Sequence, residues 1–516
     1  MREVLAELIA RYPSTRVVLL SSLAEGADRL VARVALGLAI SLVVPLPLER
    51  SDYESDFATP ESLQEFRSLL ERADAAFVVP PVERSATNGD SRGARSHAYA
   101  NCGAYVVRKS IEIVALWDGV AAPSRGTAEV VAFQLDGIPA PYVAARRELD
   151  LSVVGPVRHV ATPRGTAGDA AALPAATTST LYPRALAGKG AAEAFEKAKA
   201  DIDRFNRDVV AGGRRSSGGV REDAAAVANV YRGRTARSLA AIFVFVFLSV
   251  VGFNIYATVP GRPIWLLLAY LSCVALAFGV YYASRRGDWQ NRYQDCRAFA
   301  EVLRVAHYWK MAGIADRVAE IFAENHRAEI DWISFAIRTV TEPLGPDQPA
   351  QPNPDAAALQ RVYDEWLEHE HHYFTDFAGR RERHRSALFA RMVSTALLLS
   401  IVLTVSMRLL SAFDADGTLD RAALFAATVL AIVAALLSSY ADKRGWAEHV
   451  RRYELMATLF GRARDRVAEL LKRGEPDAET ARRIREILRD LGEEALRENA
   501  AWLNLHRSRP IDVPTA

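Results

Sequence analysis

Two loops in the N-terminal part of the chain contain residues suited to holding a phosphate group. The candidate ligand-binding residues are Ser22, Gly26 and Asp28 in the first loop, and Asp118, Gly119, Gly126, Thr127 and Glu129 in the second. Gly26 and Gly126 each precede a stretch with helical character, and the N–H groups and dipole at a helix N-terminus favour an anion. A tight turn by itself would explain either glycine. Two such loops at one edge of a sheet favour a phosphate-bearing ligand.

Short apolar runs precede both loops and predict the fold that positions them. The runs cover residues 16–21, 41–46, 75–80 and 111–117, and helical stretches alternate with them at 27–38, 60–73, 98–110 and 127–136. Such runs are typical of strands buried on both faces. The alternation predicts an α/β, Rossmann-like, doubly wound parallel sheet, in which ligands bind at the carboxyl ends of the strands. The Ala-, Thr-, Pro- and Gly-rich stretch that follows, from about 150 to 190, predicts an edge strand and a linker.

Four long apolar blocks lie in the second half of the chain. They cover residues 239–256, 264–283, 392–407 and 422–441, and none contains a charged residue. A membrane-spanning helix needs roughly 20 apolar residues, and long helices of soluble proteins keep a polar stripe. The third block reaches this length if Arg408 extends to the membrane interface. The blocks therefore predict an all-α membrane region with four transmembrane helices in two hairpins.

Basic residues flank the two hairpins on one side. Arg232, Arg234 and Arg237 precede the first block, Arg285, Arg286 and Arg292 follow the second, Arg380, Arg381, Arg383, Arg385 and Arg391 precede the third, and Lys443, Arg444, Arg451 and Arg452 follow the fourth. Cytoplasmic flanks carry the excess of Lys and Arg in multi-pass proteins. We therefore predict a multi-pass protein of the cell inner membrane with both termini in the cytoplasm, and only the loops near Val259 and Asp416 outside.

The sequences at the two hairpins are similar to each other. Residues 234–239 and 384–389 open the hairpins with related sequences, and residues 286–293 and 444–453 close them. A duplicated two-helix unit explains this similarity. The expected domains are a ligand-binding domain (1–148), a linker with an edge segment (149–195), the first hairpin with cytoplasmic helices (196–341), a Pro-rich linker (342–355), and the second hairpin with C-terminal cytoplasmic helices (356–516).

The N-terminal part resembles a known superfamily. The segments SSLAEGADRLVARVAL (21–36), VVPLPLERSDYESDF (43–57) and ALWDGVAAPSRGTAEVVAF (115–133) closely resemble the SLOG superfamily, which includes the lonely-guy nucleotide phosphoribohydrolases and the lysine-decarboxylase-like proteins. Gly126 and Thr127 match the family's G-T-x-x-E turn, with Glu129 one position early, and Gly26 and Asp28 match its G-x-D element. The resemblance implies a Rossmann-like domain that binds a nucleotide-derived ligand.

Two departures from the superfamily pattern bear on catalysis. The chain begins with a helix where the family has its first strand and glycine loop, so we expect either that translation starts upstream or that the ligand site is incomplete. Pro123-Ser124-Arg125 stands where the phosphoribohydrolases have a double glycine, and no partner arginine is evident. The resemblance therefore implies ligand sensing, with no catalytic residue assigned. Glu129 is the candidate acid–base residue in the alternative, an enzyme.

The C-terminal half also resembles a family. Residues 293–304 with Trp309, and residues 498–510, which include Asn499, Trp502 and His506, resemble the SLATT family of SLOG-associated transmembrane modules. That family pairs a nucleotide sensor with a pore-forming effector in bacterial conflict systems. The resemblance spans most of residues 231–510.

Several other features narrow the function. The net charge of +2, from 64 basic and 62 acidic residues, argues against general nucleic-acid binding. The 3 cysteines are too far apart for a disulfide framework or a metal-ligand spacing. In the run from His369 to His372 only these two histidines share a helix face, so no metal site is predicted.

The preferred hypothesis is a membrane effector gated by a nucleotide-type ligand, with no other cofactor. Four mostly apolar helices offer no polar lumen, so a pore requires a homo-oligomer. Two alternatives remain: a membrane-anchored enzyme that hydrolyses the N-glycosidic bond of a nucleotide, and a non-catalytic membrane scaffold.

Overall fold

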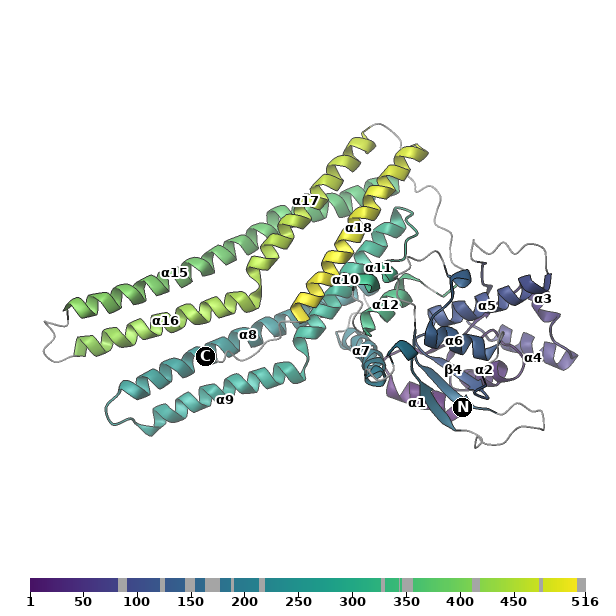
Figure 1. The fold of residues 1–516 in the computed structure, drawn as a ribbon, viewed down its shortest axis with the longest axis horizontal. Coiled ribbons are helices and arrows are strands. Elements are labelled where there is room, and N and C mark those ends of the chain that lie inside the picture. Colours follow the sequence, from purple (N-terminus) through teal and green to yellow (C-terminus); the bar gives the residue numbers. More distant parts are fainter. Residues whose placement is uncertain are drawn as a thin grey trace. The chain divides into compact units, whose positions relative to one another are not determined.

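The computed structural model shows two compact units (Figure 1). It describes residues 1–81, 91–120, 126–143, 154–162, 177–186, 190–212, 219–325, 330–342, 344–345, 356–410, 418–472 and 477–507. The first unit comprises Met1–Ser217 and Arg317–Pro349, and the second comprises Gly218–Asp316 and Ala350–Ala516. Packing thus divides the chain at points other than the expected boundaries. A segment between the two hairpins joins the N-terminal unit.

Hydrogen bonds join the strands of the first unit into two three-stranded sheets. The strands are β1 (Val18–Leu20), β2 (Ser41–Leu46), β3 (Ala75–Val78), β4 (Ile113–Trp117), β5 (Val157–Ala161) and β6 (Thr178–Leu181). The first sheet is parallel with the order β1-β2-β3, and the second has the order β4-β5-β6, with β4 parallel and β6 antiparallel to β5. The four predicted strands are present. The strand expected at an edge, β5, lies between two others, and β6 forms within the expected linker.

The first unit also contains helices. They are α1 (Arg2–Arg11), α2 (Ala27–Gly37), α3 (Arg50–Glu54), α4 (Pro60–Glu71), α5 (Ser91–Lys109), α6 (Thr127–Asp136), α7 (Ala191–Ala211), α11 (Val318–Asn325) and α12 (Trp332–Thr341). Helices α2 and α5 contact β2, and α6 contacts β4 and β5. One core cluster gathers Leu42, Val44 and Phe66 around the first sheet, and another gathers Ile113 and Val157 around the second.

Local sequence explains where α4 begins. The Thr59 hydroxyl accepts a hydrogen bond from the Ser62 N–H at 3.2 Å, and Pro60 occupies the first helical position. A hydroxyl cap and a proline at this position both stabilise a helix start. This start was predicted. Helix α5 was predicted to begin at residue 98 but begins at Ser91.

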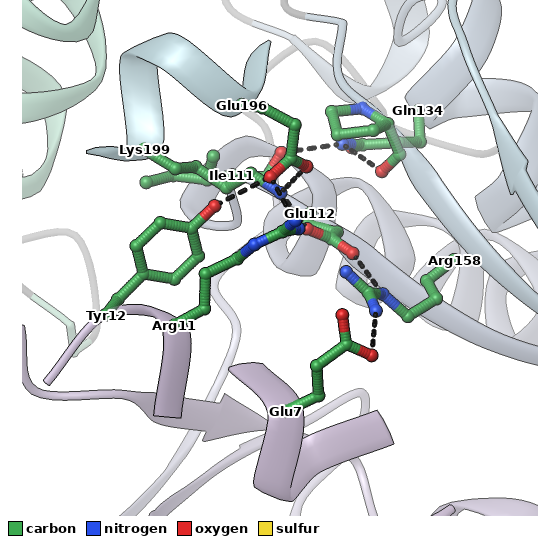
Figure 2. A network of polar contacts seen from close by, with 10 residues as sticks. Glu7, Arg11, Tyr12, Ile111, Glu112, Gln134, Arg158, Glu196 and Lys199 are labelled. Atoms are coloured by element: carbon green, nitrogen blue, oxygen red, sulfur yellow. Dashed lines mark hydrogen bonds and ion pairs between the residues drawn. The ribbon is translucent and has the colours of Figure 1, made fainter. Parts of the chain in front are cut away.

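A network of buried ions ties α1 and α7 to the amino ends of β4 and β5 (Figure 2). Glu112, directly before β4, accepts from Lys199 Nζ and from Arg158 Nε, each at 2.7 Å. These three side chains are only 9–11% exposed. Glu196 accepts from Lys199 at 2.7 Å and from the Tyr12 hydroxyl at 2.8 Å. Each buried charge in this network therefore has an opposite partner, as burial requires.

The second unit is helical. Its elements are α8 (Val220–Thr258), α9 (Ile264–Arg286), α10 (Trp289–Met311), α13 (Ala356–Val362), α14 (His369–His372), α15 (Gly379–Leu410), α16 (Thr418–Arg444), α17 (Trp446–Leu471) and α18 (Ala478–Arg507). Two π-helical stretches, Tyr363–Glu368 and Tyr373–Ala378, flank α14. Four helical stretches, each containing one of the predicted blocks, are long and apolar enough to cross a membrane.

The two hairpins, α8–α9 and α15–α16, share one plan (Figure 1). The chain leaves the first through Asp288, in the left-handed region with φ 53°, and Trp289 then begins α10. It leaves the second through Gly445, with φ 65°, and Trp446 begins α17. Each exit helix folds back onto the entry helix of its hairpin, α10 on α8 and α17 on α15, and α18 contacts both exit helices.

Candidate functional site

The loop after β1 is closed by its own side chains. The Asp28 carboxylate accepts hydrogen bonds from the Ser21 hydroxyl and the Ala24 N–H. Burial raises the pKa of Asp28 above its ordinary value, although these two hydrogen bonds act to lower it. Leu23 is fully buried with φ 57°, a conformation that non-glycine residues rarely adopt. The structure therefore gives Asp28 a role in shaping the loop.

A buried arginine is hydrogen-bonded to the same loop. Arg29 is 1% exposed, and its Nε donates to the Leu23 carbonyl at 3.0 Å. Its Nη1 donates to the carbonyl and the hydroxyl of Ser62 at 2.8 and 2.7 Å. The guanidinium also lies 4.4 Å from the centre of the Phe57 ring. The sequence pattern alone predicts no role for Arg29.

Ser22 lies beside a cysteine from α5. Its Oγ is 3.3 Å from Cys102 Sγ, and its carbonyl accepts from the Tyr53 hydroxyl at 3.1 Å. Burial raises the pKa of Cys102 to about 12, so its thiol stays protonated at neutral pH. Because the thiolate is the nucleophilic form, the Ser22–Cys102 contact is not a nucleophilic pair.

Polar groups from α3–α4 and α5 extend this cluster toward the surface. Tyr99 and Arg95 both donate to the carboxylate of Asp56. The rings of Tyr53 and Tyr99 lie 6.0 Å apart. Sequence reasoning missed these residues and Cys102. They come from segments separated by about 40 residues, and no local motif links them.

The two predicted glycines occupy equivalent positions. Gly26 precedes α2 with φ 89°, and Gly126 precedes α6 with φ 86°. Apart from the chain neighbours, no heavy atom of the described residues lies within 4 Å of the place where a Cβ would stand at either residue. Neither helix start has a hydrogen bond from an N-cap side chain. Both turns are thus open, and both require a backbone conformation that glycine favours.

The loop after β4 is shaped by Asp118. Its Oδ1 accepts from the Val120 N–H at 3.0 Å, and the Trp117 indole donates to the Val120 carbonyl at 3.1 Å. Gly119 follows with φ 84°, near the His159 ring. The loop then continues through residues 121–125, which include Pro123-Ser124-Arg125 and lie outside the described residues.

The remaining predicted residues lie in the first turn of α6. Thr127 is exposed, and Glu129 is half-buried. The Glu129 carboxylate is close enough to Tyr142 to raise the pKa of that phenol, after the larger effect of burial. The eight predicted residues therefore fall into two groups, one after β1 and one after β4. Leu116 of β4 packs in the same core cluster as Leu19 of β1, but the two strands belong to different sheets.

The residues that resemble the SLATT family meet at the contact of α10 with α18. Arg297 lies 4.5 Å from the Trp502 ring centre, and Asn499 Nδ2 donates to the Ala298 carbonyl at 2.9 Å. The Trp309 indole donates to the Leu488 carbonyl at 3.0 Å. Two segments about 200 residues apart thus form one interface. Residues 508–510 lie outside the described residues.

The histidine-rich run makes ordinary packing contacts. His371 Nδ1 lies 3.1 Å from the Ala457 carbonyl, and His372 pairs with Asp376 at 2.7 Å. Glu370 pairs with Arg304. Burial raises the pKa of Glu370 to about 7, although Arg304 acts to lower it. In the part of the chain that the structure describes, no cluster of three or more His, Cys, Asp or Glu side chains has metal-site geometry.

The arrangement around β1 and β4 can thus receive an anion at two open glycine turns, beside hydroxyl groups from Ser22 and Thr127. Burial raises the pKa of the Cys102 thiol in this arrangement, which favours its protonated form. Comparison with family models, with curated proteins and with solved structures found no match for this chain.

Proposed function

We propose that this protein is an effector of the bacterial inner membrane that responds to a nucleotide-derived ligand. In this proposal the first unit is a Rossmann-like, doubly wound domain in which β1 and β4 lie next to each other, giving the strand order 3-2-1-4-5-6. Leu116 of β4 and Leu19 of β1 support this order because both pack against the same core cluster. Ligand binding then rearranges the membrane helices, and several copies together permeabilise the membrane.

The open glycine turns carry the ligand part of the proposal. Gly26 and Gly126 are the N-cap residues of α2 and α6, after β1 and β4, and no non-adjacent atom of the described residues lies within 4 Å of a Cβ position at either one. The N–H groups and the positive dipole end of each helix favour phosphate oxygens. Glu129 in the first turn of α6 repels a phosphate. We therefore assign it to the hydroxyl groups of the ribose.

The membrane part of the proposal rests on four helices with apolar exposed faces. Leu398 and Ile401 of α15 are 62% and 60% exposed, and Trp265 of α9 is 64% exposed. Apolar faces of this kind are stable in contact with lipid, whereas their contact with water is unfavourable in free energy. A pore then requires several chains, because few polar groups on these four helices can line a channel.

Binding is tested on the purified full chain in lipid nanodiscs. Isothermal titration against a panel of nucleoside mono-, di- and cyclic phosphates is expected to find at least one ligand. Analysis of the same mixtures for free base is expected to find none. If no member of the panel binds, the sensing proposal fails. If free base is released, the enzyme alternative replaces it.

Topology is tested by cysteine labelling in a background with Cys102, Cys273 and Cys296 replaced. Thr258, the last residue of α8, and Ala478, the first of α18, are both exposed. Thr258→Cys is expected to react with an impermeant reagent in intact cells, and Ala478→Cys only after the cells are opened. Labelling of Ala478→Cys in sealed cells would show that the C-terminal helices lie outside.

A further inference from the structure

A group of five arginines surrounds the base of the first hairpin. They are Arg232, Arg234 and Arg237 of α8, and Arg285 and Arg286 of α9, here named the arginine collar. All five are exposed. Within the residues that the structure describes, none of them has an acidic partner. Their positive charge is therefore not neutralised inside the described fold.

Two helices bring the collar together at one level. Ser238 Oγ lies 3.4 Å from Ser284 Oγ, which fixes α8 beside α9 at this point. Arg237 and Arg285 are the residues next to these two serines. The uncharged stretches of the hairpin begin at Leu239 and end at Ala283. The collar thus lies directly where the apolar part of the hairpin ends.

The polar contacts of the arginine collar are with uncharged groups, so they do not neutralise its positive charge. Arg237 Nε donates to the Gly233 carbonyl at 3.2 Å, and Arg285 Nη1 donates to the Tyr281 hydroxyl at 2.7 Å. Arg234 lies 5.2 Å from the ring centre of Tyr231. A guanidinium has five N–H donors, so each of these arginines retains donors for another group.

Several arginines around the second hairpin differ in their partners. Three of α15 and one of α17 have acidic partners in the fold: Arg380 with Asp376 at 2.7 Å, Arg383 with Glu454 at 3.6 Å, Arg385 with Glu382 at 3.4 Å, and Arg452 with Glu448 and Glu498, each at 3.2 Å. The two hairpins share a plan, so this difference belongs to their side chains.

We infer that the arginine collar binds the phosphate groups of anionic phospholipids. A guanidinium forms two parallel hydrogen bonds to a phosphate, and headgroup phosphates lie at the level where the apolar part of a transmembrane helix ends. Basic residues near a membrane surface attract anionic lipids. An acidic protein segment offers the same charge, but the position of the collar beside the apolar stretch favours lipid. The four paired arginines near the second hairpin contribute less to such binding, because acidic side chains already neutralise them.

The test uses the purified full chain and native mass spectrometry. Phosphatidylglycerol and phosphatidylcholine are titrated into the detergent-solubilised protein, and the bound lipids are counted. The collar variant is R234Q/R237Q/R285Q/R286Q, and the charge-matched control is R380Q/R383Q/R385Q/R452Q. The parent chain is expected to retain phosphatidylglycerol in preference to phosphatidylcholine. The collar variant is expected to bind phosphatidylglycerol at least about tenfold more weakly, and the control less than about twofold more weakly.

Two further arms keep the inference falsifiable. The variant R234K/R237K/R285K/R286K keeps the charge and the insertion signal, and it is expected to lose affinity by a smaller factor than the Gln variant, because Lys makes no paired hydrogen bonds. Inorganic phosphate at millimolar concentration is expected not to displace the lipid. Equal binding of the two lipids, equal loss in the collar and control variants, or displacement by phosphate would each overturn the inference.

Discussion

The two ends of the strands in the first unit are built in opposite ways. At the amino ends of β4 and β5, Glu112 is buried between Lys199 and Arg158, and every buried charge has a partner close by. At the carboxyl ends of β1 and β4, Gly26 and Gly126 form turns where no non-adjacent atom of the described residues lies within 4 Å of a Cβ position. The difference separates an end that buried ion pairs hold together, the closed end, from an end with two open glycine turns, the open end, where we propose that the ligand binds.

The largest expected effect is a loss of stability when the buried carboxylate at the closed end is removed. Glu112→Gln leaves Lys199 and Arg158 buried without their shared carboxylate, and such a loss costs about 3–5 kcal/mol of unfolding free energy. Hydrogen-exchange mass spectrometry of the full chain should show this loss in the peptides of β4 and β5. The control is Glu7→Gln. The Glu7 side chain is 61% exposed and lies 3.7 Å from Arg158, so we expect a change below about 0.5 kcal/mol. Equal effects of the two variants would remove the distinction between the ends.

The next largest expected effect is a loss of ligand affinity when a side chain is placed at the open turn before α6. Gly126→Val forces a β-branched residue into a turn with φ 86° and places a side chain over the α6 start. We expect ligand affinity to fall by about 100-fold or more, which corresponds to about 2.7 kcal/mol. Isothermal titration of the full chain measures it.

Gly190→Val is the matched control for that substitution. Gly190 precedes α7 with φ 70° and also has no atom within 4 Å of a Cβ position. Gly190 is left-handed helical, so its replacement imposes a milder backbone strain than that at Gly126, and it does so away from the candidate site. Affinity should therefore stay within about twofold of the parent. If Gly126→Val binds as the parent does, or if Gly190→Val loses as much, the open turn at α6 is not the ligand site.

The contributions of Glu196, at the closed end, and Asp28, at the open end, to the stability of the first unit should change with pH in opposite directions. Although burial opposes it, hydrogen bonds from Lys199 and Tyr12 lower the pKa of Glu196. An acidic group whose pKa is lowered by folding stabilises the folded state at pH values above its ordinary pKa. That stabilisation is lost as the pH falls through the folded-state pKa. Glu196→Gln should therefore destabilise the first unit at neutral pH by the order of 1 kcal/mol, with solvent screening included. The deficit should disappear in acid. A constant deficit at all pH values would contradict this account.

The smallest expected effect concerns Asp28. Burial raises the pKa of Asp28. The protonated carboxyl group therefore stabilises the fold at pH values below the ordinary pKa, and this stabilisation is lost as the pH rises through the folded-state pKa. Asp28→Asn keeps an oxygen that accepts from Ser21 or Ala24 and removes the buried charge. We expect it to be neutral or to stabilise the unit by up to about 1 kcal/mol at neutral pH. Thermal unfolding at two pH values measures it, and a loss above about 1 kcal/mol would mean that the Asp28 charge is required.

Composition and local signals predicted the parts of this fold that depend on nearby residues. The uncharged blocks predicted the four apolar helices, because a membrane-spanning helix needs an unbroken apolar stretch. Thr59 and Pro60 predicted the start of α4 because both act within one helical turn. Strand β6 was missed, since Thr178–Leu181 has little apolar character and is ordered by pairing with β5.

Long-range packing set the features that the sequence did not predict. Phe335 of α12 packs near Phe195 of α7, 140 residues earlier in the chain, which places α12 in the first unit. The same limit applies to the candidate site. The glycine turns were predicted from their place before helices, whereas Tyr53 and Cys102 reach Ser22 through contacts across 31 and 80 residues. No local motif encodes such contacts.

The central claim is that ligand binding at the open end of the first unit permeabilises the membrane. The most direct test is dye release from sealed vesicles that contain the full chain, with its cytoplasmic face outward and a nucleotide that binds added outside. We predict rapid release with the parent chain and with Gly190→Val, and none with Gly126→Val or without nucleotide. Vesicles that stay sealed while the inserted parent chain has bound its nucleotide would contradict the claim.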